Sequence, residues 1–139
     1  MKKTTIILCF SLLLVSCKQA IKEKDIIKLN GYWEIQKVEL PSGEKKEYKV
    51  NETIDFFEIK NNKGFRQKVM PQLDGRYLTN DIKETIQISN EEGDFFINYT
   101  TSYGKWKEEI IELRDSALVL KNKDNIEYHY KRQVPFSVK

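Results

Sequence analysis

LNGYWEI, residues 29–35, opens the part of the chain in which almost every segment favours β-structure. From Gly31 onward, runs of β-branched and aromatic residues alternate with clusters of Asn, Asp, Gly, Pro and Ser. Such clusters favour turns, and their recurrence about every ten residues is typical of antiparallel barrels and sandwiches. No long helical pattern follows residue 29, and no repeat of solenoid length is visible. The stretch therefore marks the start of a small all-β domain.

The segments between the turn clusters are the expected strands. Their ranges are 31–40, 53–60, 65–70, 75–79, 85–89, 94–101, 106–113, 117–121 and 126–132. Phe95, Ile97 and Tyr99 share one face of their strand, and polar residues occupy most of the other. Tyr128 and Tyr130 likewise share one face of the last strand, with polar residues on the other face. Because side chains of a strand point alternately to opposite faces, these strands have one face toward a core and one toward water.

Two of the expected strands are less regular. Trp33 and Ile35 share a face of the first strand, whereas Val38 falls on the opposite face, so we expect a kink within it. In residues 53–60 apolar side chains occupy both faces, which indicates a bulge or burial on both sides.

The residues before the domain have the layout of a secretory leader. Lys2 and Lys3 precede an uncharged segment, residues 4–15, and the small Ser16 follows it. The segment is shorter than the roughly 20 apolar residues that cross a bilayer, so we interpret it as a cleaved leader and not as a transmembrane helix. Residues 17–28 are mostly charged, and we interpret them as a polar tether with a short helical turn near its end.

The leader ends in Leu14-Val15-Ser16-Cys17, which resembles the lipobox of bacterial lipoproteins. In that family the cysteine thiol receives diacylglycerol, the leader is removed before it, and the new amino group is acylated. The resemblance implies that Cys17 becomes the lipid-bearing first residue of the mature chain; the alternative is an ordinary leader that happens to end beside a cysteine. Lys18 stands where enteric bacteria place the Asp that retains lipoproteins at the inner membrane, which favours the bacterial outer membrane. We favour the periplasmic face of that membrane over the alternative, the cell surface.

Cysteine count and charge exclude several classes of function. Of the two cysteines, Cys9 lies in the leader and Cys17 carries the lipid, so no thiol remains for a disulfide, a metal or a nucleophile. Loss of the leader takes Lys2 and Lys3 from the 24 basic residues and leaves 22, against 21 acidic residues. A nucleic-acid-binding protein needs a clustered basic surface, so we expect no nucleic-acid partner. We also expect the chain to be a monomer.

Three parts of the domain resemble the small lipocalin-like lipoproteins of Bacteroidetes-type bacteria: residues 29–35, residues 74–77 (DGRY), and the two final strands. The resemblance covers residues 29–132 and implies an antiparallel, up-and-down β-barrel of about eight to nine strands. No helix follows the last strand and no Thr-Asp-Tyr-like motif is present, so we expect a short, partly open barrel. The chain then divides into a signal peptide (1–16), a lipidated N-terminus and tether (17–28), and a lipocalin-like β-barrel domain (29–139).

The same resemblance assigns one structural pair. In lipocalins the Trp of Gly-x-Trp closes one end of the barrel, and a basic residue late in the last strand packs over it. Carried over to this chain, Trp33 is that Trp and Arg132 is the basic residue, a cation stacked on an indole face. The alternative is a core Trp33 and a solvated Arg132.

Motifs for catalysis or metal binding are absent from the sequence. His129 is the single histidine and falls on the polar face of its strand, so we expect a surface residue and no metal site. Glu108, Glu109 and Glu112 lie in one strand. We interpret them as a solvated charged face beside Trp106, and not as the carboxylate pair of a glycosidase. We therefore expect neither enzymatic activity nor a cofactor.

Aromatic residues are the best candidates for a binding site, because the chain has seven Tyr, seven Phe and two Trp. The candidate ligand-lining residues are Tyr99, Trp106, Tyr128 and Tyr130. Two functions stay open. The first is a membrane-anchored lipoprotein that binds a small hydrophobic ligand or an envelope protein partner. The second is a structural or interaction lipoprotein of an envelope complex, with a filled barrel and no small-molecule ligand.

Overall fold

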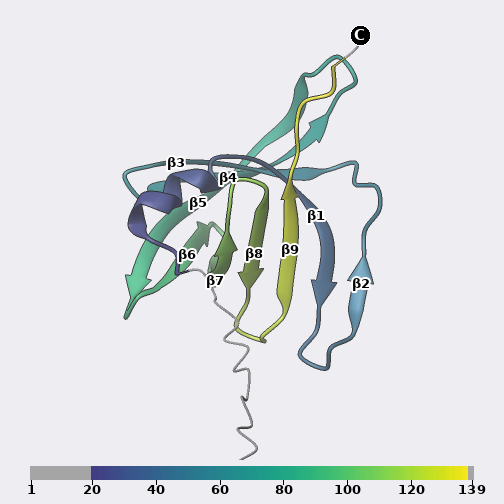
Figure 1. Cartoon of the computed structure of the whole chain (residues 1–139). Coiled ribbons are helices and arrows are strands. Elements are labelled where there is room, and N and C mark those ends of the chain that lie inside the picture. Colours follow the sequence, from purple (N-terminus) through teal and green to yellow (C-terminus); the bar gives the residue numbers. More distant parts are fainter. Residues whose placement is uncertain (1–19, 138–139) are drawn as a thin grey trace, which may run out of the picture.

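The computed structural model describes residues 20–137 and consists of a short 3-10 helix followed by nine strands (Figure 1). The elements are η1 (Glu23–Leu29), β1 (Gly31–Glu39), β2 (Lys45–Glu47), β3 (Ile54–Lys60), β4 (Lys63–Pro71), β5 (Tyr77–Glu91), β6 (Asp94–Thr101), β7 (Gly104–Leu113), β8 (Ala117–Lys121) and β9 (Glu127–Arg132). They form one antiparallel sheet in the order β2-β1-β3-β4-β5-β6-β7-β8-β9. Within residues 20–137, no helix has the length and apolar character that crossing a bilayer requires.

The sheet closes on itself. β1 pairs with β9 from Trp33 opposite Arg132 to Glu39 opposite Glu127, so eight strands form a barrel. β2 is an extra strand that pairs with the end of β1, beyond the residues that pair with β3. The all-β, up-and-down prediction is confirmed. The expectation of a partly open barrel is wrong, because the first and last strands complete the ladder.

Register shifts explain where the strand pattern was irregular. The kink expected in the first strand is present, as a shift between Ile35 and Lys37 in the β1–β9 ladder. The two strands expected at 75–79 and 85–89 are one long strand, β5. Residues in its middle resemble a turn, but Asp81 adopts a positive φ of 60° within a bulge, and the ladder with β4 continues on both sides.

The helix η1 covers one end of the barrel, which we call the η1 end. Ile26 and Leu29 of η1 are buried in the apolar core with Phe57, Ile97 and Leu118. Residues 23–28, which we assigned to the tether, thus pack as part of the folded domain. The turns β3–β4 and β7–β8 lie at the η1 end, where Asn30 is hydrogen-bonded to Ile59 and Arg132 to Asp115. The turns β1–β2 and β8–β9 lie together at the opposite end, which we call the far end, and the β4–β5 hairpin extends beside the C-terminal segment (Figure 1).

An aromatic cluster on the outer face accounts for the apolar residues on both sides of β3. Phe57 faces the core, whereas Phe56 lies 4.7 Å, centre to centre, from Tyr32. The Tyr32 ring stacks on Tyr77 at 3.8 Å. The C-terminal segment passes beside the β4–β5 hairpin (Figure 1), where the Tyr77 hydroxyl donates a hydrogen bond of 2.6 Å to Gln133.

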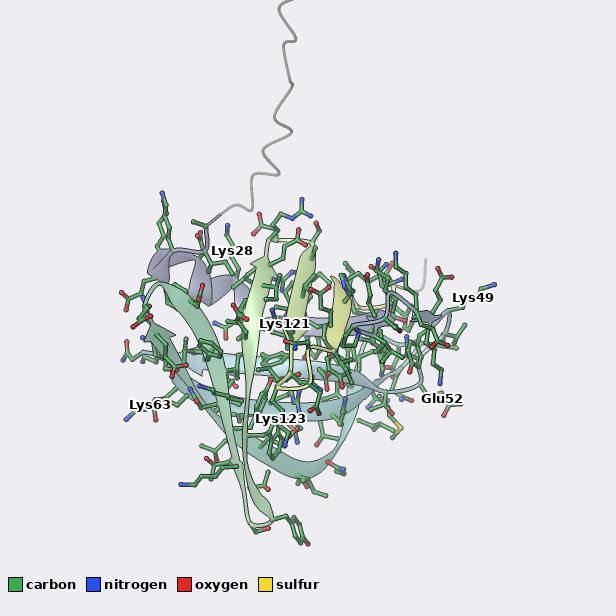
Figure 2. The ribbon with its side chains drawn as sticks, turned by 90° about the horizontal axis from the view of Figure 1, so that it is seen from below. Lys28, Lys49, Glu52, Lys63, Lys121 and Lys123 are labelled. Carbon is green, nitrogen blue, oxygen red and sulfur yellow. The ribbon has the colours of Figure 1, made fainter. Side chains whose placement is uncertain are left out.

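Charged side chains surround the barrel (Figure 2). The labelled lysines come from separate elements, with Lys28 in η1, Lys63 at the start of β4 and Lys121 at the end of β8. Many outer-face charges have a partner on a neighbouring strand, such as Lys121 and Glu109, whose charged atoms are 3.5 Å apart.

Candidate ligand site inside the barrel

Trp33 and Arg132 meet at the η1 end. Trp33 is fully buried, its indole Nε1 donates a hydrogen bond of 2.9 Å to the Leu29 carbonyl, and the Arg132 guanidinium lies 4.2 Å from the ring centre. Burial and the cation on the ring face therefore hold Trp33 between the core and the last strand.

Arg132 also fastens three segments by hydrogen bonds. Its guanidinium donates to the carbonyls of Lys28 and Asn30 at 2.5 and 2.8 Å, and to the carbonyl of Asp115 in the β7–β8 turn. Gly31 lies under it with φ of 120°, and a Cβ there would be 2.5 Å from the Arg132 side chain. Only glycine combines this backbone conformation with the room that the arginine needs.

Charged side chains lie inside the barrel beyond this apolar end. Arg66 on β4 forms two hydrogen bonds, of 2.9 and 2.8 Å, with the carboxylate of Glu84 on β5. The Arg66 guanidinium also lies over the ring of Tyr99, 4.3 Å from its centre, and Tyr99 is fully buried. Nearby, the Lys68 ammonium is 2.6 Å from the buried carboxylate of Asp55.

Glu108 on β7 belongs to the same interior cluster. It is only 7% exposed, so the expectation that it belongs to a solvated charged face is wrong. Its Oε1 is 3.6 Å from Arg66, too long for a hydrogen bond, and accepts no hydrogen bond from any residue that the structure describes. Glu109 points to the outer face, as alternation requires.

Burial controls the ionisation of this cluster. It raises the pKa of the Glu108 carboxyl, and the Tyr99 hydroxyl and the positive charge of Arg66 together offset only part of that shift. Burial also raises the pKa of Tyr99 and of Tyr130 well above the usual tyrosine value, so both hydroxyls stay neutral. The site is thus a desolvated environment in which hydrogen bonds and charges act strongly.

The structure places the four sequence-predicted lining residues on the interior side of the barrel. Tyr99 and Tyr130 are buried, Tyr128 is half-buried against the core, and Trp106 is 40% exposed near the far end. The rings of Tyr99 and Trp106 stack at 5.1 Å. These aromatic residues and the Arg66–Glu84–Glu108 charges together form the candidate site.

The sequence reasoning missed the charged half of this site. Glu108 shares its strand face with Trp106 and Ile110, so alternation alone would have placed it inside the barrel; the solvated interpretation was preferred because its side chain is charged. Arg66 and Glu84 gave no such signal, because they become neighbours only through the β4–β5 register.

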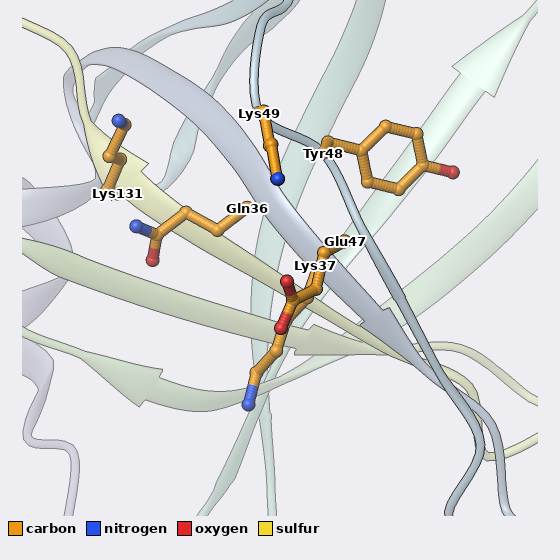
Figure 3. Close-up of a pocket in the computed structure, with 6 residues that line it drawn as sticks. All are labelled: Gln36, Lys37, Glu47, Tyr48, Lys49 and Lys131. Atoms are coloured by element: carbon orange, nitrogen blue, oxygen red, sulfur yellow. The ribbon is translucent and has the colours of Figure 1, made fainter.

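Two pockets lie outside the barrel. One, of about 300 Å³, is lined by Lys37, Lys49 and Lys131 with Gln36, Glu47 and Tyr48 (Figure 3). Another, of about 190 Å³, lies beside the β8–β9 turn. The interior aromatic residues line neither of them.

Glu108→Gln should change how stability depends on pH. Because the pKa of Glu108 is raised in the fold, the folded chain keeps this proton to higher pH than the unfolded chain. The free energy of unfolding therefore falls as pH rises from the ordinary value of 4.5 through the raised one. Glutamine is neutral throughout, so in urea unfolding the stability of the variant relative to the unsubstituted chain should increase as pH rises above 4.5. The control is Glu109→Gln on the outer face; an equal pH response of both variants would contradict the burial of Glu108.

Solved structures of similar shape share little sequence with the chain. A lipocalin-like protein from Bacteroides uniformis is 13% identical, with a TM-score of 0.48, covering 76% of this chain and 99% of its own. Apocrustacyanin C1 is 12% identical, with a TM-score of 0.47, covering 84% of this chain and 67% of its own. No curated protein sequence matches the chain.

A protein-family model gives the assignment. The model of the lipocalin-like domain matches residues 29–120, from the end of η1 to β8. The match thus spans most of the chain and most of the closed barrel. The chain belongs to the family of lipocalin-like domains.

Proposed function

We propose that this chain is a membrane-anchored lipocalin-like module that binds a small ligand inside the barrel, between the apolar core and the far end. The observation that carries the proposal is Glu108 Oε1, a buried acceptor without a hydrogen bond from the described residues. Its ion pair with Arg66, at 3.6 Å, is too long for a hydrogen bond, and a buried acceptor without a hydrogen bond costs about 1–3 kcal/mol. A ligand that donates a hydrogen bond there would recover this cost.

The surroundings of Glu108 indicate the ligand's chemistry. Tyr99, Trp106, Tyr128 and Tyr130 offer aromatic surface to an apolar body. Glu108 favours one polar group on that body, a hydroxyl or an N–H. A small hydrophobic molecule with a single hydrogen-bond donor satisfies both requirements.

The anchoring half of the proposal depends on the lipobox resemblance. Cys17 lies outside the described residues, as does the leader before it. Two or three acyl chains hold a protein stably on a membrane, whereas one chain holds it only marginally. The proposed location is the periplasmic face of the bacterial outer membrane.

Native mass spectrometry of the full chain, released from detergent micelles, tests ligand binding. We expect a bound small molecule that is retained by the unsubstituted chain and lost from Trp106→Ala, which removes the exposed wall of the site. The matched control is Tyr103→Ala, since Tyr103 is a fully exposed aromatic in the β6–β7 turn. A chain without a bound molecule, or a bound molecule that Trp106→Ala keeps as well as Tyr103→Ala does, contradicts the proposal.

A second candidate function has its own supporting observation. Apolar side chains are exposed on the β4–β5 hairpin and on the C-terminal segment beside it: Met70, Leu73, Leu78, Ile82, Val134 and Phe136. An exposed apolar surface of this kind favours contact with a protein partner. A barrel that carries no bound molecule in native mass spectrometry would favour this interaction role over ligand binding.

A further inference from the structure

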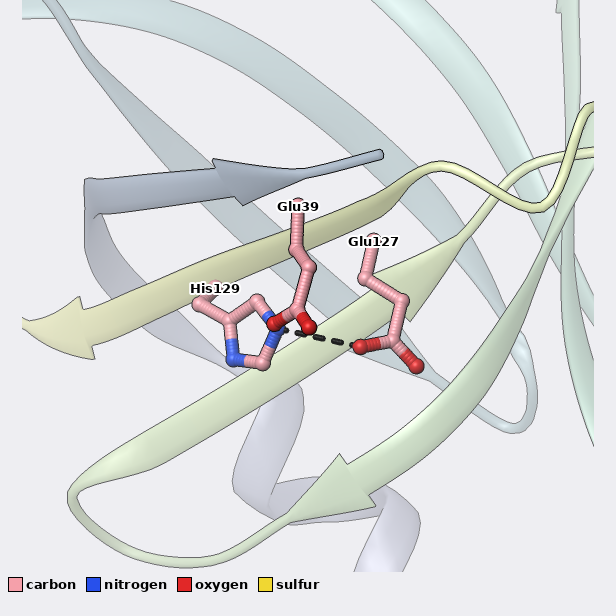
Figure 4. Close-up of side chains that lie close together, drawn as sticks. All are labelled: Glu39, Glu127 and His129. Atoms are coloured by element: carbon pink, nitrogen blue, oxygen red, sulfur yellow. Dashed lines mark hydrogen bonds and ion pairs between the residues drawn. The ribbon is translucent and has the colours of Figure 1, made fainter. Parts of the chain in front are cut away.

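Two carboxylates and the single histidine converge on the outer face at the far end of the barrel (Figure 4). Glu39 is the last residue of β1, and Glu127 and His129 lie on β9. His129 Nε2 is 3.2 Å from Glu127 Oε2 and 3.8 Å from Glu39 Oε2. One donor atom from each residue lies within 4.8 Å of the other two.

The negative charges of Glu39 and Glu127 lack neighbouring lysine or arginine side chains among the described residues. Glu39 and Glu127 are directly opposite each other in the β1–β9 ladder, a position in which like charges repel. Among residues 20–137, no lysine or arginine nitrogen lies within 4.0 Å of either carboxylate, and the His129 imidazole is their close partner. Other outer-face carboxylates do have such a cation: Glu109 pairs with Lys121, and Glu34 pairs with Lys131.

The donor set matches a borderline divalent metal. Zinc holds nitrogen and oxygen ligands at about 2.0–2.1 Å in a tetrahedron, which places the ligand atoms about 3.3 Å apart. The two distances from His129 Nε2 lie close to that spacing. Imidazole nitrogen favours zinc over magnesium and calcium, which prefer oxygen ligands in larger number. All three side chains are partly exposed, so water can supply a fourth ligand.

We propose that Glu39, Glu127 and His129 form a zinc-binding site that joins β1 to β9 at the far end of the barrel seam. Because the ligands come from both strands, zinc bound there would cross-link the pairing that closes the barrel. Trp33 and Arg132 hold the same two strands at the η1 end. The site lies on the outer face and does not depend on the interior ligand site.

Calorimetry tests the proposal with the full chain, purified in detergent through an affinity tag without histidine and treated with EDTA. Titration with zinc chloride should show one site per chain, and magnesium chloride and calcium chloride should show none. His129→Gln and Glu39→Gln should each weaken zinc binding by at least about tenfold, because each removes a direct ligand. Glu109→Gln, which changes a carboxylate that already has its lysine, should bind zinc like the unsubstituted chain.

Two further measurements separate a seam-bridging site from loose surface binding. Zinc should shift the imidazole ¹⁵N signals of His129, which are unambiguous because the chain has one histidine. Zinc should also raise the melting temperature of the unsubstituted chain, since a ligand of the folded state alone stabilises it, and should not raise that of Glu39→Gln. Absence of zinc binding, unshifted imidazole signals, or equal affinity of His129→Gln and Glu109→Gln would overturn the proposal.

Discussion

Trp33→Ala is expected to lower the free energy of unfolding by about 3–5 kcal/mol, the range found for removing a large aromatic side chain from a core. Trp33 is fully buried, and its loss leaves a cavity between η1 and the sheet. The variant also loses the hydrogen bond to Leu29 and uncovers the Arg132 guanidinium. Domains of this size have a total stability of about 5–15 kcal/mol, so the loss is a large fraction of it.

The second tryptophan provides the matched control. Trp106 is 40% exposed, and its ring stacks on one buried side chain, Tyr99. Trp106→Ala should therefore lower the free energy of unfolding by only about 1 kcal/mol. Trp33→Phe, which fills most of the space but donates no hydrogen bond, should fall between the two alanine variants. Urea unfolding followed by circular dichroism measures all three. Equal losses for Trp33→Ala and Trp106→Ala would show that Trp33 does not anchor the η1 end.

Most strands of the barrel and the faces of their side chains were predictable, because apolar and polar residues alternate in a strand that has one face toward solvent. Alternation placed Phe95, Ile97 and Tyr99 on the core side of β6, where all three are buried. Turn clusters placed most strand ends to within a few residues. The exposed strand β2 was missed, because its Lys-Lys-Glu sequence carries no apolar pattern.

The interior charges were hidden for a different physical reason. A buried charge is stabilised by partners on other strands, and those partners depend on register and bulges. Arg66 faces Glu84 only because the β4–β5 ladder shifts between Gln67 and Val69 and continues past the bulge at Asp81. The sequence does not show which charges become neighbours, so each charged residue was interpreted as exposed to solvent.

The same reasoning applies to the outer face. His129 was correctly expected on the polar side of its strand, but the sequence could not show which residues meet it there. Glu39 reaches it from β1, some 90 residues away in the chain, through the β1–β9 seam. Strand register therefore creates both sets of neighbours: the β4–β5 ladder pairs Arg66 with Glu84, and the β1–β9 seam brings together the residues of the proposed zinc site.

Cys17→Ser should abolish lipid attachment to the full chain. Acylation in the lipoprotein family that the leader resembles begins at a cysteine thiol, and serine offers no thiolate. We expect the variant to incorporate no labelled palmitate, to retain its leader as a larger precursor, and to lose stable acyl-chain anchoring. Labelling with palmitate, gel mobility and membrane fractionation measure these three results.

The other cysteine is the control for this experiment. Cys9 lies in the apolar part of the leader, so Cys9→Ser should leave labelling and processing unchanged. Labelled Cys17→Ser protein would contradict the lipobox interpretation, and a processed but unlabelled unsubstituted chain would indicate an ordinary leader. Zinc binding and ligand binding belong to the barrel, and neither depends on the lipid. A Cys17→Ser precursor that still binds zinc through His129 would separate loss of the anchor from loss of the fold.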